Sequence, residues 1–147
     1  MLFDTQVIGA EVFKTTNGGK SWKKTHKNFL DGVYSSYGYY FGEIRVDLQD
    51  ENGIYVMGVP IIKSKDGGKT FTSISKENVH ADHQALWVNP RKPGHLLNGN
   101  DGGLNLSYDD GKNWTNISSG GFQTGGNGGI GITCKSGSVV FSPGLIV

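Results

Sequence analysis

The chain has 147 residues, of which 24 are glycine and four are proline, and its formal net charge is +1. This length fits one domain, and the near-neutral charge gives no electrostatic reason to expect a nucleic-acid partner or an anionic membrane surface. The high glycine content favours many tight turns over long helices, and no apolar run is long enough to span a membrane.

Short strand-like runs follow one another along the chain, separated by Gly, Asn and Asp, and no segment keeps a helical apolar period for three turns. The first runs are residues 5–10, 11–17 and 21–26. We interpret them as strands two to four of a four-stranded unit without its first strand.

Two complete units are predicted after this partial one. The strands of the first complete unit are expected at 42–48, 54–59, 61–66 and 69–75, with a turn at 49–53. Those of the second are expected at 85–90, 95–100, 103–109 and 113–118, with a turn at 100–103. Its third strand alternates Leu104 and Leu106 with Asn105 and Ser107, the period expected of a strand with one apolar face.

The tail, residues 120–147, is rich in glycine and lacks a place in the repeated plan. Residues 131–141 are expected to form a hairpin with Ser136 and Gly137 at its turn. Cys134 is the one cysteine, so no disulfide can form within the chain, and its neighbours give it no nucleophilic context.

One phrase occurs three times, as TTNGGKSW from Thr15, SKDGGKTF from Ser64 and SYDDGKNW from Ser107. The recurrence of one phrase at similar intervals along the chain indicates a repeat architecture. Asp or Asn accepts hydrogen bonds from backbone amides in such turns, Gly supplies a positive φ, and the aromatic residue begins the next strand and packs beneath the unit. The residues expected to have this structural role are Thr15, Asn17, Gly19, Trp22, Ser64, Asp66, Gly68, Phe71, Ser107, Asp109, Gly111 and Trp114.

The three phrases resemble the Asp-box, or BNR, repeat of sialidases, sortilin-type domains and xyloglucanase-type glycoside hydrolases. The longer stretch VHADHQALWVNPRKPGHLLNGNDGGLNLSYDDGKNW is similar to bacterial sortilin-like and glycosyl-hydrolase-like BNR proteins. The resemblance implies an all-β fold, a partial β-propeller of about two and a half four-stranded antiparallel blades. The blades are expected at about 5–30, 42–76 and 84–119, within residues 1–119, with the Asp-box turn between strands three and four.

The resemblance also implies partners and a location. A closed propeller needs more blades than this chain holds, so further blades or self-association are expected. The family is mostly secreted or on the cell surface, whereas the first residues show no signal peptide, which leaves the location open.

In an up-and-down unit, alternate turns lie at the same end. The repeated turns therefore share one face, and the links between units share the other with the turns between strands two and three. In the family, sites usually occupy this second face. The expected ligand-binding residues there are Tyr37, Tyr39, Tyr40, His80, Asp82, His83 and Asp101.

These residues have competing interpretations. The tyrosines form a stacking platform for sugar rings or fill the gap between units. His80, Asp82 and His83 suggest a metal triplet, but no fourth ligand is evident, and such residues more often fasten one unit to the next. We therefore expect neither a metal nor a cofactor.

Three functions remain open from the sequence. The favoured one is a module that binds a glycan or a protein ligand. The second is part of a glycoside hydrolase that uses Asp82 or Asp101 as acid or base, and the third is an inactive fragment. A sialidase site is not expected, because it needs three arginines for the substrate carboxylate and the chain has only Arg45 and Arg91.

Overall fold

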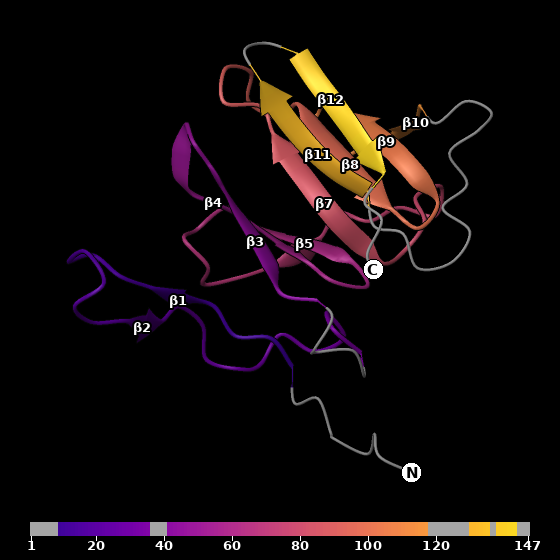
Figure 1. Cartoon of the computed structure of the whole chain (residues 1–147). Coiled ribbons are helices and arrows are strands. Elements are labelled where there is room, and N and C mark those ends of the chain that lie inside the picture. Colours follow the sequence, from indigo (N-terminus) through magenta and orange to yellow (C-terminus); the bar gives the residue numbers. More distant parts are fainter. Residues whose placement is uncertain (1–8, 36–40, 118–129, 136–137, 144–147) are drawn as a thin grey trace.

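The computed structural model describes residues 9–35, 41–117, 130–135 and 138–143, and every regular element among them is a β-strand (Figure 1). The all-β prediction is confirmed at this level. Within these ranges no helix is long and apolar enough to cross a membrane.

Two four-stranded antiparallel sheets form the centre of the molecule, and each is built in chain order. The first sheet contains β3 (Glu43–Asp47), β4 (Asp50–Met57), β5 (Ile61–Ser64) and β6 (Thr72–Ser73). The second contains β7 (His83–Val88), β8 (Leu96–Asn100), β9 (Gly103–Ser107) and β10 (Thr115–Asn116). We call these sheets the second and third units, and both agree with the predicted order of strands.

The turn between β3 and β4 is tighter than the sequence suggested. The predicted turn at 49–53 is wrong for most of its length, because β4 already begins at Asp50. The backbone amide of Gln49 donates to Asp47 Oδ1 at 2.9 Å, and Asp47 pairs directly with Asp50. This side-chain bond closes the turn within two residues, so Glu51 to Gly53 remain free to continue the strand.

The first unit contains β1 (Phe13–Lys14) and β2 (Lys23–Lys24), which pair antiparallel. Most of the predicted strand 5–10 lies outside the described residues. Ala10, at its end, forms an isolated antiparallel bridge with Leu30 through two backbone hydrogen bonds of 2.9 and 3.2 Å.

The tail contains the predicted hairpin. β11 (Ile130–Lys135) and β12 (Ser138–Pro143) pair antiparallel, and their expected turn at 136–137 lies outside the described residues. β11 lies against β7 and β8 of the third unit (Figure 1).

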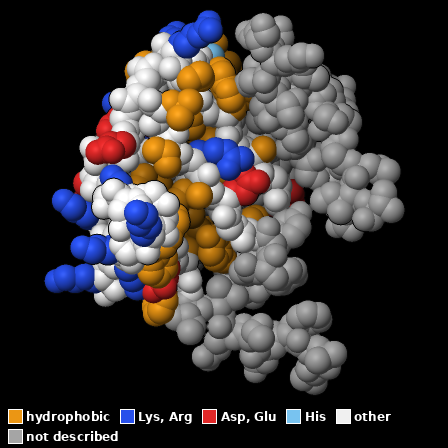
Figure 2. Space-filling view, turned by 60° about the vertical axis from the view of Figure 1, so that its left-hand side comes forward, with side chains coloured by type: hydrophobic (Ala, Val, Ile, Leu, Met, Phe, Trp, Pro, Cys, Tyr) orange, Lys and Arg blue, Asp and Glu red, His pale blue; other side chains and the backbone are white. Residues whose placement is uncertain are grey.

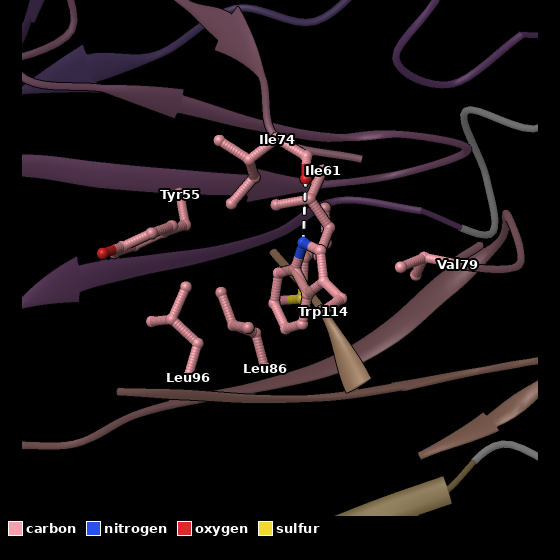
Figure 3. Close-up of a cluster of buried hydrophobic side chains, with 8 residues drawn as sticks. Tyr55, Ile61, Ile74, Val79, Leu86, Leu96 and Trp114 are labelled. Atoms are coloured by element: carbon pink, nitrogen blue, oxygen red, sulfur yellow. Dashed lines mark hydrogen bonds between the residues drawn. The ribbon is translucent and has the colours of Figure 1, made fainter. Parts of the chain in front are cut away.

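The central strands of the second unit, from Ile54 to Met57 of β4 and throughout β5, are buried on both faces, because successive side chains of a strand point to opposite sides. Ile54 and Val56 of β4 face the first unit, in a cluster with Ala10, Val12, Val33 and Ile62. Tyr55 and Met57, between them in sequence, face the third unit. Figure 3 shows this second cluster, which also contains Ile61, Ile74, Val79, Leu86, Leu96 and Trp114. The three units are therefore stacked in chain order.

Candidate functional site

The three repeated turns share one hydrogen-bond pattern. In the second turn, Ser64 Oγ donates to Asp66 Oδ1 at 2.8 Å and accepts from the Gly68 amide at 2.8 Å. Asp66 Oδ1 also accepts from the amide of Thr70 at 2.9 Å. The third turn repeats these bonds at 3.0, 2.9 and 2.8 Å with Ser107, Asp109, Gly111 and Asn113. The first turn repeats them at 3.0 Å each with Thr15, Asn17, Gly19 and Ser21.

The turn carboxylates are saturated by their own loops. Hydrogen bonds from the backbone amide and hydroxyl of Thr70 lower the pKa of Asp66 to about 2. The side-chain amide of Asn113, together with its backbone amide, likewise lowers the pKa of Asp109. These bonds all lie within one loop, so they hold each turn in its conformation.

The turn aromatics of the second and third units pack on the preceding unit. Trp114 of the third unit is 5% exposed, and its Nε1 donates to the carbonyl oxygen of Ile74 at 2.9 Å (Figure 3). Phe71 of the second unit meets the ring of His26 edge-on at 5.9 Å. Trp22 of the first unit is 59% exposed. The expectation that each aromatic packs beneath its unit therefore fails for Trp22.

The turns of the second and third units lie at two opposite ends. At one end, which we call the link end, the β4–β5 turn meets the links between units. There the Val59 amide donates to Val33 O at 2.7 Å, and the Asp82 and His83 amides donate to Val59 O and Gly58 O at 3.1 and 2.9 Å. The repeated turns lie at the other end, where the Asp110 amide donates to Gly94 O.

His83 is held inside the link end. Its side chain is 1% exposed, its Nδ1 lies 2.9 Å from Asn98 Oδ1, and its Nε2 lies 3.2 Å from Ser75 Oγ. Ser75 Oγ in turn accepts the Ile61 amide at 2.9 Å. Burial lowers the pKa of His83. This chain of bonds ties the end of the second unit to β7 and β8, so both ring nitrogens are engaged by the protein.

His80, Asp82 and Asp101 come together at the surface of the same end. Asn100 Nδ2 donates to His80 O at 2.9 Å, and Asn100 Oδ1 accepts the Gly102 amide at 2.9 Å, which places the β8–β9 turn beside the link. Burial raises the pKa of Asp101, and the nearby charge of Asp82 raises it further. The interaction with His80 acts in the other direction and lowers the pKa of Asp101. The three side chains are thus close enough to interact through their charges.

Asp82 also has an unusual backbone. Its φ is +62°, a conformation that non-glycine residues seldom adopt. The bond from its amide to Val59 holds it there. Such strain costs about 1–3 kcal/mol and is often found at binding sites.

The expected tyrosine platform cannot be placed, because Tyr37, Tyr39 and Tyr40 lie outside the described residues. Tyr34 is half-buried against the cluster between the first and second units, and burial raises its pKa. Phe41 is 9% exposed. Among the described residues, no group of three His, Cys, Asp or Glu side chains is arranged to hold a metal.

A charged cluster at the opposite end was missed from the sequence. Lys63 is 7% exposed and pairs with Asp110 of the third unit, while Tyr55 Oη donates to Asp110 at 2.8 Å. Burial alone would raise the pKa of Asp110, but the bonds from Lys63 and Tyr55 outweigh it and the pKa is lowered. A hollow of about 540 Å³ beside this cluster is lined by charged residues that include Lys65 and Lys112.

The sequence carried a signal for this cluster. Lys63 follows Ile61 with the period of two that marks one strand face, and Ile61 belongs to the core. A lysine in that register is expected to be buried and paired.

The comparisons with known proteins leave the chain unassigned. No family model matches it, and no curated protein matches it.

Proposed function

We propose that the chain is a segment of an Asp-box β-propeller that binds a glycan at its link end. The propeller assignment is supported by three turns with one hydrogen-bond pattern, each on a successive stacked unit. The binding assignment is carried by one observation: Asp82 and Asp101, from different segments, converge at the surface with His80.

The chemistry of this cluster favours a neutral polyol. Two carboxylates offer only acceptors, and the hydroxyls of a sugar are donors. The bond from the Asp82 amide to Val59 O fixes the backbone that carries this carboxylate before a ligand arrives, which lowers the ordering cost of binding. His83 is left out of this binding set, because both of its nitrogens already contact the protein.

The test is a glycan array followed by calorimetric titration of any oligosaccharide that is captured. Asp82→Asn and Asp101→Asn each keep the side-chain shape, and Asn tolerates a positive φ. We expect each to weaken binding by about tenfold or more, the effect typical of a central contact. Asp50→Asn is the matched control, because Asp50 lies at the β3–β4 turn, away from the link end. An empty array, or binding that survives both substitutions, would refute the proposal.

A glycoside hydrolase is the second candidate, and the nearness of two carboxyl groups favours it. Asp101 has a raised pKa and Asp82 lies near it, and most glycoside hydrolases use a pair of carboxyl groups that flank the scissile bond. Turnover of a chromogenic glycoside that either substitution abolishes would support hydrolysis. Binding without turnover would support the binding module.

A further inference from the structure

The two junctions between units share one arrangement of the backbone. At the junction of the first and second units, His26 Nε2 accepts the Val12 amide at 2.9 Å. At the junction of the second and third units, Ser75 Oγ accepts the Ile61 amide at 2.9 Å. His26 and Ser75 each lie four residues after the aromatic residue of their turn. The repeated plan therefore extends past the turns, and the two junctions can be compared position by position.

The two junctions differ in charge. Residues 24–30 and 73–79 are equivalent, and each segment is followed along the chain by the lysine of the next repeated turn, Lys69 or Lys112. The first set contains three lysines and no carboxylate, whereas the second contains two lysines and one carboxylate. The excess of positive charge is therefore particular to the first junction, and the repeated plan does not require it.

The lysines of the first junction surround a hollow. It has a volume of about 530 Å³ and is lined by residues 24–30 and by Lys69. We call it the basic hollow. Figure 2, in which the left-hand side of Figure 1 with β1 and β2 comes forward, shows Lys and Arg side chains gathered on this side of the molecule. The sequence agrees, because residues 9–35 contain five lysines against Glu11 and Asp31.

Two of the three ammonium groups at the basic hollow lack a carboxylate partner within the described part of the chain. Lys24 pairs with Glu11, and its Nζ also lies 4.6 Å from the centre of the Phe29 ring. Lys27 and Lys69 are exposed, and neither forms an ion pair with a described Asp or Glu side chain. These two lysines therefore leave positive charge at the hollow that a ligand can neutralise.

The walls of the basic hollow are held in place by their own hydrogen bonds. Thr25 Oγ1 donates to Gly68 O at 2.9 Å, which keeps Lys69, the next residue, beside the first unit. Because His26 Nε2 accepts a backbone amide, Nδ1 carries the ring hydrogen and donates it to Asn28 O at 2.5 Å. These bonds fix the backbone of the hollow before a ligand arrives, which lowers the ordering cost of binding.

We propose that the basic hollow is a second binding site, which takes a sulfate or carboxylate group carried by a sugar chain. A lysine ammonium group pairs with either anion as a compact charge. Phe29 and Asn28 line the same hollow, so the sugar that carries the anion meets both an apolar ring and an amide. The basic hollow shares no residue with the acidic cluster at the link end, so the two sites are tested separately.

A nucleic acid is a less suitable ligand for this surface. Nucleic-acid sites spread basic residues along a stripe or over a face, and their affinity grows with the number of phosphates that they contact. Here the unpaired lysines line one hollow, and the net charge of the whole chain is only +1. A single-stranded DNA is therefore the competing ligand in the test.

The test is calorimetric titration of the full chain with three hexasaccharides, at low and at raised salt concentration. A heparin fragment carries sulfate and carboxylate groups, a hyaluronan fragment carries carboxylate groups alone, and maltohexaose is neutral. We expect the heparin fragment to bind and added salt to weaken its binding, because salt screens the charge of exposed lysines. Binding of the hyaluronan fragment as well would identify carboxylate as sufficient, and its absence would identify sulfate as the required group.

Lys27→Gln and Lys69→Gln each remove one of the unpaired charges. Both positions are exposed, so we expect the variants to fold, which circular dichroism checks. Each should weaken binding of the heparin fragment by about fivefold or more. Lys112→Gln is the matched control, because Lys112 has the position of Lys69 in the third turn, is exposed, and does not line the basic hollow.

The proposal is overturned if the heparin fragment does not bind the wild-type chain. It is also overturned if Lys112→Gln weakens binding as much as Lys69→Gln, because the attraction would then be spread over the surface. Tighter binding of a single-stranded DNA of matched charge than of the heparin fragment would overturn the assignment to a sugar chain.

Discussion

At the scale of single residues, the repeated turns use a carboxylate and an amide for the same purpose. Asp66 and Asp109 receive the bonds in two turns, and Asn17 receives the equivalent backbone bond in the first. Asn17 differs in one respect, because its Nδ2 donates to Ser21 Oγ, whereas Asp66 accepts from Thr70 Oγ1. The geometry of the turn therefore tolerates either residue, and only the carboxylate adds a dependence on pH.

Asp66→Asn should make stability less sensitive to acid. The pKa of Asp66 falls from 3.8 to about 2 in the folded chain. A lowered pKa means that the charged form stabilises the fold above pH 4 and that this contribution is lost as the pH falls toward 2. Thermal melts between pH 5 and pH 2 should show a smaller loss for Asp66→Asn than for the wild type. If the melting temperatures of the two proteins fall equally as the pH is lowered, the lowered pKa of Asp66 would be contradicted.

Asn105→Leu should stabilise the protein. Asn105 is 1% exposed, and its side-chain oxygen and nitrogen are buried without a hydrogen-bond partner in the described structure. An unsatisfied buried amide costs about 1–3 kcal/mol, so an apolar side chain of similar size should recover about 1 kcal/mol or more. Urea unfolding measures the change, with the exposed Asn113→Leu as a comparison that should not stabilise. A lower midpoint for Asn105→Leu would show that the amide has a partner.

The sequence could predict the turns because their contacts are local. The Ser or Thr, the Asp or Asn and the Gly of each turn lie within five residues, so the phrase itself contains its hydrogen bonds. The exposure of Trp22 could not be predicted in this way, because the same phrase buries Trp114. What covers the aromatic residue is the neighbouring unit, which the phrase does not specify.

At the scale of elements, the stacking of units depends on a glycine at each turn. Gly111 and Gly19 have similar φ angles of +79° and +86°, but only Gly111 has a neighbour in contact, with Ile74 Cβ 2.9 Å from an added Cβ. Alanine substitution at these two glycines therefore separates the free-energy cost of the backbone conformation from the cost of crowding the preceding unit.

Gly111→Ala should destabilise the chain more than Gly19→Ala. Both changes place a side chain at a positive φ, which costs about 1–2 kcal/mol. Gly111→Ala also overpacks the contact with Ile74, which costs a further 1–3 kcal/mol, roughly. Chemical denaturation of the monomeric protein measures both. Equal losses would mean that the Gly111 contact does not hold the second and third units together.

The order of strands within a unit was predictable at this scale, since each strand pairs with the next one in sequence. The beginning of β4 was not, because Asp47 closes the turn with a side-chain bond to the Gln49 amide that apolar periodicity does not reveal. For His83 the sequence left two interpretations open, a ligand-binding residue or one that fastens two units, and it could not name the partners. These are Ser75 and Asn98, which lie 8 and 15 residues away and come from different units.

At the scale of the whole molecule, the claim that carries the rest is that three equivalent units are stacked in chain order. The link end exists because corresponding turns of successive units lie together. Lys20, Lys69 and Lys112 occupy the same position in the three turns and are all exposed, so they report directly on the spacing.

The most direct test is the distances between pairs of spin labels placed at these lysines by Lys→Cys substitution in a Cys134→Ser background. The measurement uses a dilution at which the chain is monomeric. Equivalent stacking predicts that the distance between labels at positions 20 and 69 equals the distance between labels at 69 and 112, within the width of the measured distance distributions. It also predicts that the distance between labels at 20 and 112 exceeds both. Two clearly different neighbouring distances, or a 20–112 distance shorter than either, would contradict the account.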